Sequence, residues 1–185
     1  MTASQGPDFI NRLNDQGFFV FPTHNQEWLH NKKKLLETNH QAPIAKLVSI
    51  STGPHARTCP SDKAGGLQPV LYLCRNAKVT LTMNLSVPFG LYNGASGTVV
   101  DIIYNNGKRP PDSLPDVVMV MFPKYTGPAF ISSQPQIIPI VPIDRRLDCP
   151  CRYCKRKQIP LRLGWLELYI AAKVSQLGLV KPTDI

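Results

Sequence analysis

Three cysteines stand close together in the run Cys149-Pro150-Cys151-Arg152-Tyr153-Cys154. Two thiolates at this spacing can reach one tetrahedral zinc ion, but a closed structural site takes four ligands. Another cysteine or a histidine from a distant part of the chain would have to complete the set. The cluster is therefore a weak candidate for a zinc site, and reduced thiols on a basic loop are the alternative. The five cysteines are an odd number, which argues against a disulfide framework.

The same part of the chain carries the densest positive charge. Between Arg145 and Arg162 there are seven basic residues and one acid. Guanidinium and ammonium groups can line a phosphate backbone, and an aromatic ring among them can stack on a base. A solvated basic face without a ligand is the alternative. The candidates for nucleic-acid contact in this stretch are Arg145, Arg146, Arg152, Tyr153, Lys155, Arg156 and Lys157.

Residues for catalysis do not assemble. The four histidines stand in the first third of the chain, and no serine or cysteine near them lies in a nucleophile context. The phosphate-binding pattern Gly-x-x-x-x-Gly-Lys-Ser/Thr is absent, and no apolar strand ends in an Asp-Glu pair that would hold magnesium. The sequence therefore predicts no catalytic residue and no nucleotide hydrolysis by this chain alone.

Composition narrows the class of protein. The 185 residues carry a formal charge of +9, which favours a polyanionic partner such as nucleic acid. Eighteen prolines and only 18% charged residues suit short strands joined by turns better than long helices. No stretch approaches the roughly 20 apolar residues of a membrane span, and the N-terminus does not open a signal peptide. We expect an intracellular protein with no membrane partner.

The elements that position these residues follow from the apolar pattern. The run at residues 18–21 predicts a buried strand, and a helix follows from Asn25. Residues 52–69 are rich in glycine and proline, which is typical of a loop or linker. Alternation over residues 78–85 predicts a strand with its aliphatic residues in a core and its threonines on the other face.

A small antiparallel barrel is predicted over about residues 76–145, because several short strands follow one another at close spacing. Asn93-Gly94 is a tight-turn signal, since both residues tolerate positive φ. The last strand can only lie at an edge, because its prolines cannot donate to a ladder. The strands predicted after the turn cover residues 97–104, 117–122, 129–131 and 137–143.

Two runs, VTLTMNL at residues 79–85 and GLYNGASGTV at residues 90–99, resemble the Pif-type DNA helicases. These are superfamily-one, RecA-based motors that include the helicase parts of Helitron-like transposons. In that family the second run opens a small Src-homology-3-like barrel inserted in the second RecA-like domain. The resemblance covers about residues 9–165.

Two weaker matches agree in order and spacing. The FPT of residues 21–23 with His30-Asn31 resembles helicase motif IV, and QIPLRLGW at residues 158–165 resembles the strand that returns from the barrel. The resemblance gives Thr23 and Asn31 a role at the DNA backbone or in motif IV. On the barrel we add Lys78 and Asn93 as candidates for nucleic-acid contact, and turn geometry alone would also account for Asn93.

The departures from the family pattern limit what the resemblance implies. Trp165 is followed by LELYIAA in place of the family's Ala-x-Thr-x-His-Lys-x-Gln-Gly, and the final arginine-bearing motif is absent. The first RecA-like domain with its nucleotide loop is also absent. ATP and Mg are thus implied for a parent helicase, and no cofactor is expected in this chain.

We expect an α+β chain with a β-rich majority, in which a small Src-homology-3-like antiparallel barrel interrupts a partial RecA-like α/β half. Residues 1–51 would begin the second RecA-like domain and residues 52–75 would form a linker. Residues 76–145 would form the inserted barrel. Residues 146–185 would hold the basic segment, the return strand and a divergent C-terminal helix.

The expected function is that of a fragment of an ATP-dependent DNA helicase that alone retains at most single-stranded DNA binding. Its partners would be single-stranded DNA and the missing first RecA-like domain. The family implies DNA repair, recombination or telomere maintenance in the nucleus. The alternatives are a zinc-stabilised basic adaptor module and a non-functional, truncated transposon-derived product.

Overall fold

The computed structural model describes residues 24–38, 43–105, 107–148 and 153–165. The chain divides into two units, residues 34–164 and the remainder at the two ends. The predicted strand at residues 18–21 and most of the predicted C-terminal helix lie outside the described residues, as do four candidate site residues. These four are Thr23, Cys149, Cys151 and Arg152.

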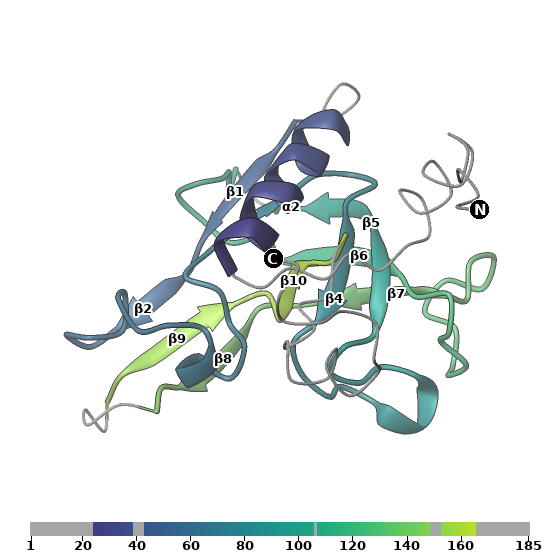
Figure 1. Ribbon diagram of the computed structural model, residues 1–185. Coiled ribbons are helices and arrows are strands. Elements are labelled where there is room, and N and C mark those ends of the chain that lie inside the picture. The colour runs from purple at the N-terminus through teal and green to yellow at the C-terminus, as the bar shows by residue number, and fades with distance from the viewer. Residues whose placement is uncertain (1–23, 39–42, 106, 149–152, 166–185) are drawn as a thin grey trace, which may run out of the picture. The chain divides into compact units, whose positions relative to one another are not determined.

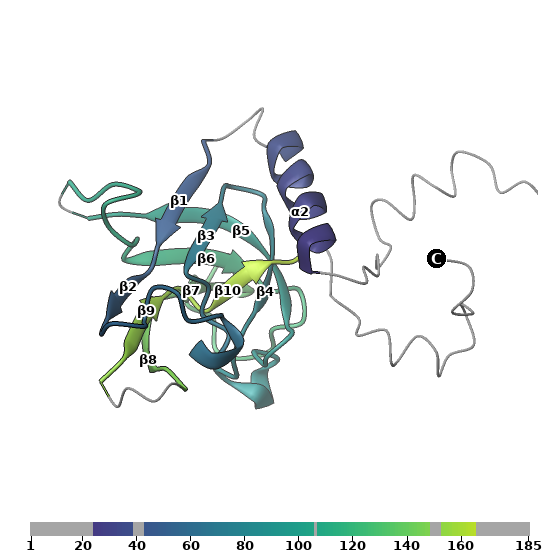
Figure 2. The ribbon, with the colours of Figure 1, turned by 60° about the vertical axis from the view of Figure 1, so that its left-hand side comes forward.

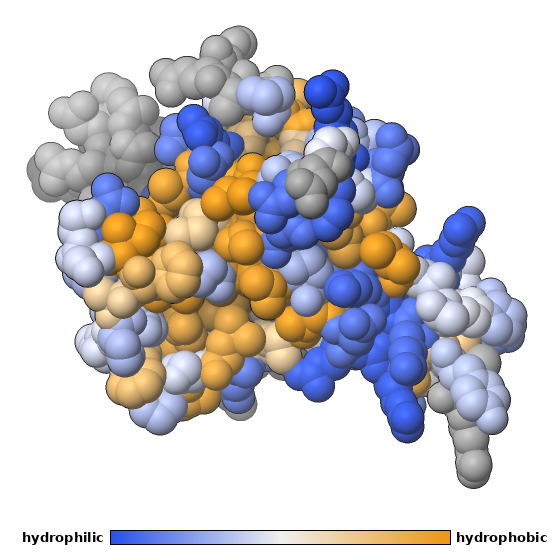
Figure 3. Space-filling model, turned by 180° about the vertical axis from the view of Figure 1, so that it is seen from behind, coloured by the Kyte–Doolittle hydropathy of each residue, from blue (hydrophilic) through white to orange (hydrophobic). Residues whose placement is uncertain are grey.

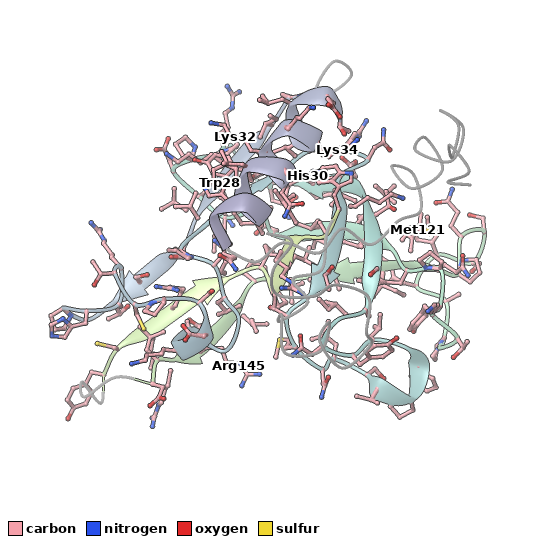
Figure 4. The ribbon with its side chains drawn as sticks, in the orientation of Figure 1. Trp28, His30, Lys32, Lys34, Met121 and Arg145 are labelled. Carbon is pink, nitrogen blue, oxygen red and sulfur yellow. The ribbon has the colours of Figure 1, made fainter. Side chains whose placement is uncertain are left out.

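The helix predicted from Asn25 is confirmed as α2 (His24–Thr38), which runs across the boundary between the two units. Leu35 is buried, whereas Trp28 and Leu36 are exposed, so the helix has no continuous buried apolar stripe. The ammonium group of Lys32 lies 5.5 Å from the centroid of the Trp28 ring (Figure 4). No helix of the described residues is long and apolar enough to cross a membrane.

The strands of the described residues form three antiparallel sheets (Figure 1). The smallest pairs two strands, another joins five, and the third joins three. The two-stranded sheet pairs β1 (Ala45–Val48) with β3 (Val70–Leu73). The five-stranded sheet has the order β10 (Leu161–Leu163), β4 (Lys78–Leu81), β5 (Ser96–Ile103), β6 (Val117–Met121) and β7 (Ile137–Ile140). The three-stranded sheet has the order β2 (Ile50–Thr52), β9 (Lys155–Gln158) and β8 (Ile143–Arg146).

The five-stranded sheet has an aliphatic interior. Val79, Leu81, Val99 and Val120 have no exposed surface, because β-branched and leucine side chains alternate toward one core. β7 lies at the edge of this sheet, as its prolines predict. β10 forms the other edge, so the pairing gives an open sheet.

Two sequence expectations about this sheet are wrong. Thr80 and Thr82 are buried, although the alternation put them on an open face. The reason is that backbone packs closely against both threonines: Gly66 lies against Thr82, and Gly164 lies against Thr80. Residues 129–131 form no strand and lie in turns and bends.

The linker expected over residues 52–75 is folded instead. It contains β3 and the short 3-10 turn η2 (Asp62–Ala64). Residues 53–67, which we call the 53–67 loop, supply most of a small buried cluster. That cluster consists of Ala56, Cys59, Ala64, Leu67, Leu147 and Cys154. The interruptions by glycine and proline therefore mark turns within a packed loop.

Candidate nucleic-acid interface

The three-stranded sheet positions the basic segment of the sequence. β8 and β9 pair antiparallel, with Arg145 opposite Arg156 and Arg146 opposite Lys155. The ladder continues beyond β8, because the N–H of Leu147 donates to the carbonyl of Cys154 at 3.0 Å. Figures 1 and 2 show β2, β8 and β9 extending away from the five-stranded sheet. The basic residues thus lie on a projecting sheet.

Side chains along β9 alternate between two faces of this sheet, as the period of a strand requires. Cys154, Arg156 and Gln158 are buried on what we call the inner face, where Cys154 and Arg156 contact the 53–67 loop. Lys155 and Lys157 are exposed or partly exposed and lie on the other face, which we call the outer face, and Tyr153 is exposed in the turn before β9. Arg146 shares this outer face, because it lies directly opposite Lys155 in the register.

Arg156 is not available to a nucleic acid, because its side chain is 0% exposed. Its Nη1 donates to the carbonyl of Leu67 at 2.9 Å, and its Nη2 donates to the carbonyls of Ala56 at 2.7 Å and Cys59 at 2.6 Å. Burial lowers the pKa of Arg156, although a guanidinium keeps its proton in proteins. The predicted phosphate contact is therefore corrected: this cation binds carbonyl oxygens of the 53–67 loop.

Gln158 is a structural residue that the sequence analysis did not single out. Its amide nitrogen donates to the carbonyls of Leu47 at 3.1 Å and Gln68 at 3.3 Å. Its amide oxygen accepts from the N–H of Ile159 at 3.0 Å. Buried and exposed residues alternate from Tyr153 to Gln158, which could have indicated this strand. Because Arg156 and Gln158 are polar, a hydrophobicity pattern does not detect the alternation.

The outer-face cations have no ion-pair partner among the described residues. Ion pairs among the described residues join other side chains, for example Arg75 with Asp101 and Lys108 with Asp116. Asp144 lies opposite Lys157 in the register but forms no ion pair with it. Charges left unpaired on an exposed sheet face are available to an external anion.

Arg145 has a different position from Arg146. It lies on the inner-face side of β8, opposite Arg156, and its side chain runs along Gly65 beside η2 (Figure 4). Its Cγ would lie 3.8 Å from a Cβ placed on Gly65. The guanidinium is exposed and can still reach an anion at the rim of the sheet.

Lys78 and Asn93 lie outside the three-stranded sheet, and Asn31 belongs to the other unit. Lys78 lies on β4 of the five-stranded sheet and donates to the Thr98 hydroxyl at 3.0 Å. The N–H of Asn93 donates to the Asn84 side chain at 2.7 Å, which fixes the turn rather than a ligand. Asn31 is buried, and its side-chain oxygen has no hydrogen-bond partner among the described residues.

The described cysteines are buried and free. Cys154 packs with Cys59 in the cluster under the 53–67 loop, and burial raises the pKa of the Cys74 thiol. No group of three His, Cys, Asp or Glu side chains in the described part of the chain could hold a metal ion. Because Cys149 and Cys151 lie outside the described residues, the zinc site stays a prediction.

The three sheets match a portion of the fold of DNA helicases. Solved structures of Pif1 helicases share it: the enzyme from Candida albicans has a TM-score of 0.56 and 20% identity, covering 80% of this chain and 35% of that one. Bacteroides Pif1 bound to ssDNA has a TM-score of 0.51 and 17% identity, covering 88% of this chain and 39% of that one. No protein-family model and no curated protein matches the chain.

The chain spans between a third and two fifths of the length of these helicases. At such low identity the likeness establishes the fold alone. The sequence resemblance to Pif-type helicases is confirmed at that level. The Helitron-like branch stays a prediction.

Proposed function

We propose that the chain is a fragment of a Pif-type helicase that binds single-stranded DNA through its three-stranded sheet. In this proposal the five-stranded sheet belongs to the Src-homology-3-like barrel inserted in a second RecA-like domain. ATP and Mg would bind to the first RecA-like domain of the parent enzyme. The nuclear location and the transposon-related origin stay predictions.

The observation that carries the proposal is the set of unpaired cations on the outer face. Surface cations usually pair with acids or scatter, whereas Arg146, Lys155 and Lys157 share one face of a projecting sheet. In Figure 3, which views the molecule from behind, hydrophilic residues dominate the lower right, where this sheet lies. The likeness to helicase structures supports a nucleic acid as the matching polyanion.

The test is a fluorescence titration of the full chain with a labelled oligothymidine at two salt concentrations. Two phosphate contacts, one at Lys157 and one at Arg146 with Lys155, give a salt slope of about −1.4, so affinity should fall about sevenfold between 50 and 200 mM salt. Replacing Lys157→Gln should lower the slope by about 0.7. Lys124→Gln is the matched control, because Lys124 is an exposed cation outside this sheet. Undetectable binding at 50 mM salt, or binding independent of salt, would refute the proposal.

A further inference from the structure

The register of β8 and β9 places like charges directly opposite each other. Facing residues of an antiparallel pair have Cβ atoms about 5 Å apart, and like charges at this separation destabilise a sheet. The pair of Arg145 with Arg156 is relieved, because the carbonyls of the 53–67 loop hold the Arg156 guanidinium. The pair of Arg146 with Lys155 has no such relief among the described residues.

An anion between Arg146 and Lys155 would remove this repulsion. A phosphate group carries the charge and the acceptor oxygens to take hydrogen bonds from both side chains. The places of the acids near this face favour an anion between Arg146 and Lys155. Asp144 lies opposite Lys157, so it offsets charge at the far end of the stripe. Asp148, whose N–H donates to the carbonyl of Lys63, forms no ion pair with Arg146 or Lys155.

The exposed aromatic side chain next to this pair is Tyr153, which lies in the turn two positions before Lys155. It is 81% exposed, the largest exposed fraction among the large apolar and aromatic side chains of the described residues. The bond from the Leu147 N–H to the Cys154 carbonyl carries the ladder up to the neighbour of Tyr153, and positions two apart along an extended chain are about 6.7 Å apart. A free aromatic ring at this distance from a phosphate site matches the way in which single-stranded nucleic acids are bound, by base stacking next to cations.

We infer that the outer face of the three-stranded sheet is a stacking platform, in which Arg146 and Lys155 hold one phosphate while Tyr153 stacks on an adjacent base. This inference rests on the proposed function and specifies the ligand as a strand with unpaired bases. A duplex keeps its bases in the stack and presents only phosphates to the ring. A polyanion without bases would gain from the cations alone.

The experiment compares two labelled strands of equal length, an oligothymidine and an abasic deoxyribose-phosphate strand, on the full chain. Tyr153→Ala should weaken oligothymidine binding about tenfold and leave abasic binding unchanged. Tyr153→Phe should retain the wild-type affinity, because it keeps the ring. Arg146→Gln should weaken both strands by a similar factor, and Lys124→Gln should weaken neither. Equal melting temperatures of the variants control for folding, since all three replaced side chains are exposed.

The outcomes separate this inference from the proposed function. If Tyr153→Ala affects both strands equally, or neither, the stacking platform is wrong while salt-dependent DNA binding stands. If a duplex of the same length binds as tightly as the oligothymidine, the preference for unpaired bases is wrong. If the wild-type chain binds neither strand, the proposed function and the platform fail together.

Discussion

The five-stranded and three-stranded sheets share antiparallel geometry but are stabilised by different means. In the former, most of the fully buried side chains are aliphatic, as at Val79, Leu81 and Val120. In the latter, the inward side chains of β9 include Arg156 and Gln158, which donate hydrogen bonds to carbonyl oxygens of the 53–67 loop and of Leu47. The first sheet depends on packing volume, and the second depends on a few directional bonds.

Charged residues are also distributed unequally between the five-stranded and the three-stranded sheet. The sequence has no charged residue from Val79 to Val100 or from Tyr125 to Ile143, stretches that contain much of the five-stranded sheet. The three-stranded sheet carries cations on both faces, and only its inner face gives one of them a fixed set of acceptors. A buried cation thus organises one face, while the opposite face keeps its cations for solvent or a ligand. The same segment therefore serves folding and the proposed binding.

The largest expected effect comes from Arg156→Met, which keeps the volume of the side chain but removes its donors. Three carbonyl oxygens would lose their partners in a buried site, and each loss costs about 1–3 kcal/mol. We expect the free energy of unfolding to fall by roughly 3–5 kcal/mol, measured by urea denaturation. Lys155→Met, on the outer face of the same strand, should change it by less than about 0.5 kcal/mol.

Equal stability of Arg156→Met and the wild type would contradict the role given to this guanidinium. A loss as small as that of Lys155→Met would mean that the 53–67 loop exchanges its carbonyl partners for water at little cost. Arg156→Lys is also informative, because an ammonium group cannot span three separated carbonyls as a planar guanidinium does. It should recover less than half of the lost stability.

The next effect concerns two glycines of the run at residues 90–99, in the five-stranded region. Gly90 has φ +86°, and a Cβ there would collide with the backbone carbonyl of Lys124. Gly94 has φ +99°, and a Cβ there would meet no atom within 4 Å. Gly94→Ala should therefore cost about 1 kcal/mol from backbone conformation alone, whereas Gly90→Ala should cost about 2–4 kcal/mol.

Thermal or urea unfolding of the two alanine variants measures this difference directly. Equal losses would show that close packing at Gly90 does not matter and that both residues serve turn conformation only. A larger loss at Gly94 would reverse the assignment. Either result would weaken the view that the five-stranded region is governed by steric fit.

The sequence predicts the two regions unequally for the same physical reason. The turn at Gly94 and the edge position of β7 follow from local rules, because glycine tolerates positive φ and Pro139 lacks an N–H. Local rules of this kind do not predict which residues are buried on the inner face of β9. Its buried members, Arg156 and Gln158, are as polar as their neighbours Lys155 and Lys157, so no contrast in polarity marks the strand.

The packing of the 53–67 loop is not predicted from the sequence, for a related reason. Its buried residues, among them Ala56, Cys59 and Leu67, lie outside strands and α-helices, because prolines and glycines between them interrupt any regular element. The carbonyls of these three residues accept from the guanidinium of Arg156, which lies about 90–100 positions further along the chain. Local pattern therefore indicates a linker where long-range hydrogen bonds form a packed loop. The outer-face candidates were found because exposed cations need no such partners.

The smallest effect separates local opening from global unfolding in the two regions. Cys59 and Cys154 lie in the cluster under the 53–67 loop, whereas Cys74 follows β3 outside that cluster. All three are buried, and burial also raises the pKa of Cys74, so each should react slowly with iodoacetamide in the native wild type.

In Arg156→Met, peptide mass spectrometry should show Cys59 and Cys154 alkylated roughly tenfold faster, because the loop has lost the hydrogen bonds of the guanidinium. Cys74 should keep its native rate under conditions in which the variant remains folded. Faster alkylation of all three thiols would mean that the two regions open as one cooperative unit, and that the hydrogen bonds of Arg156 stabilise the apolar sheet as well as the loop.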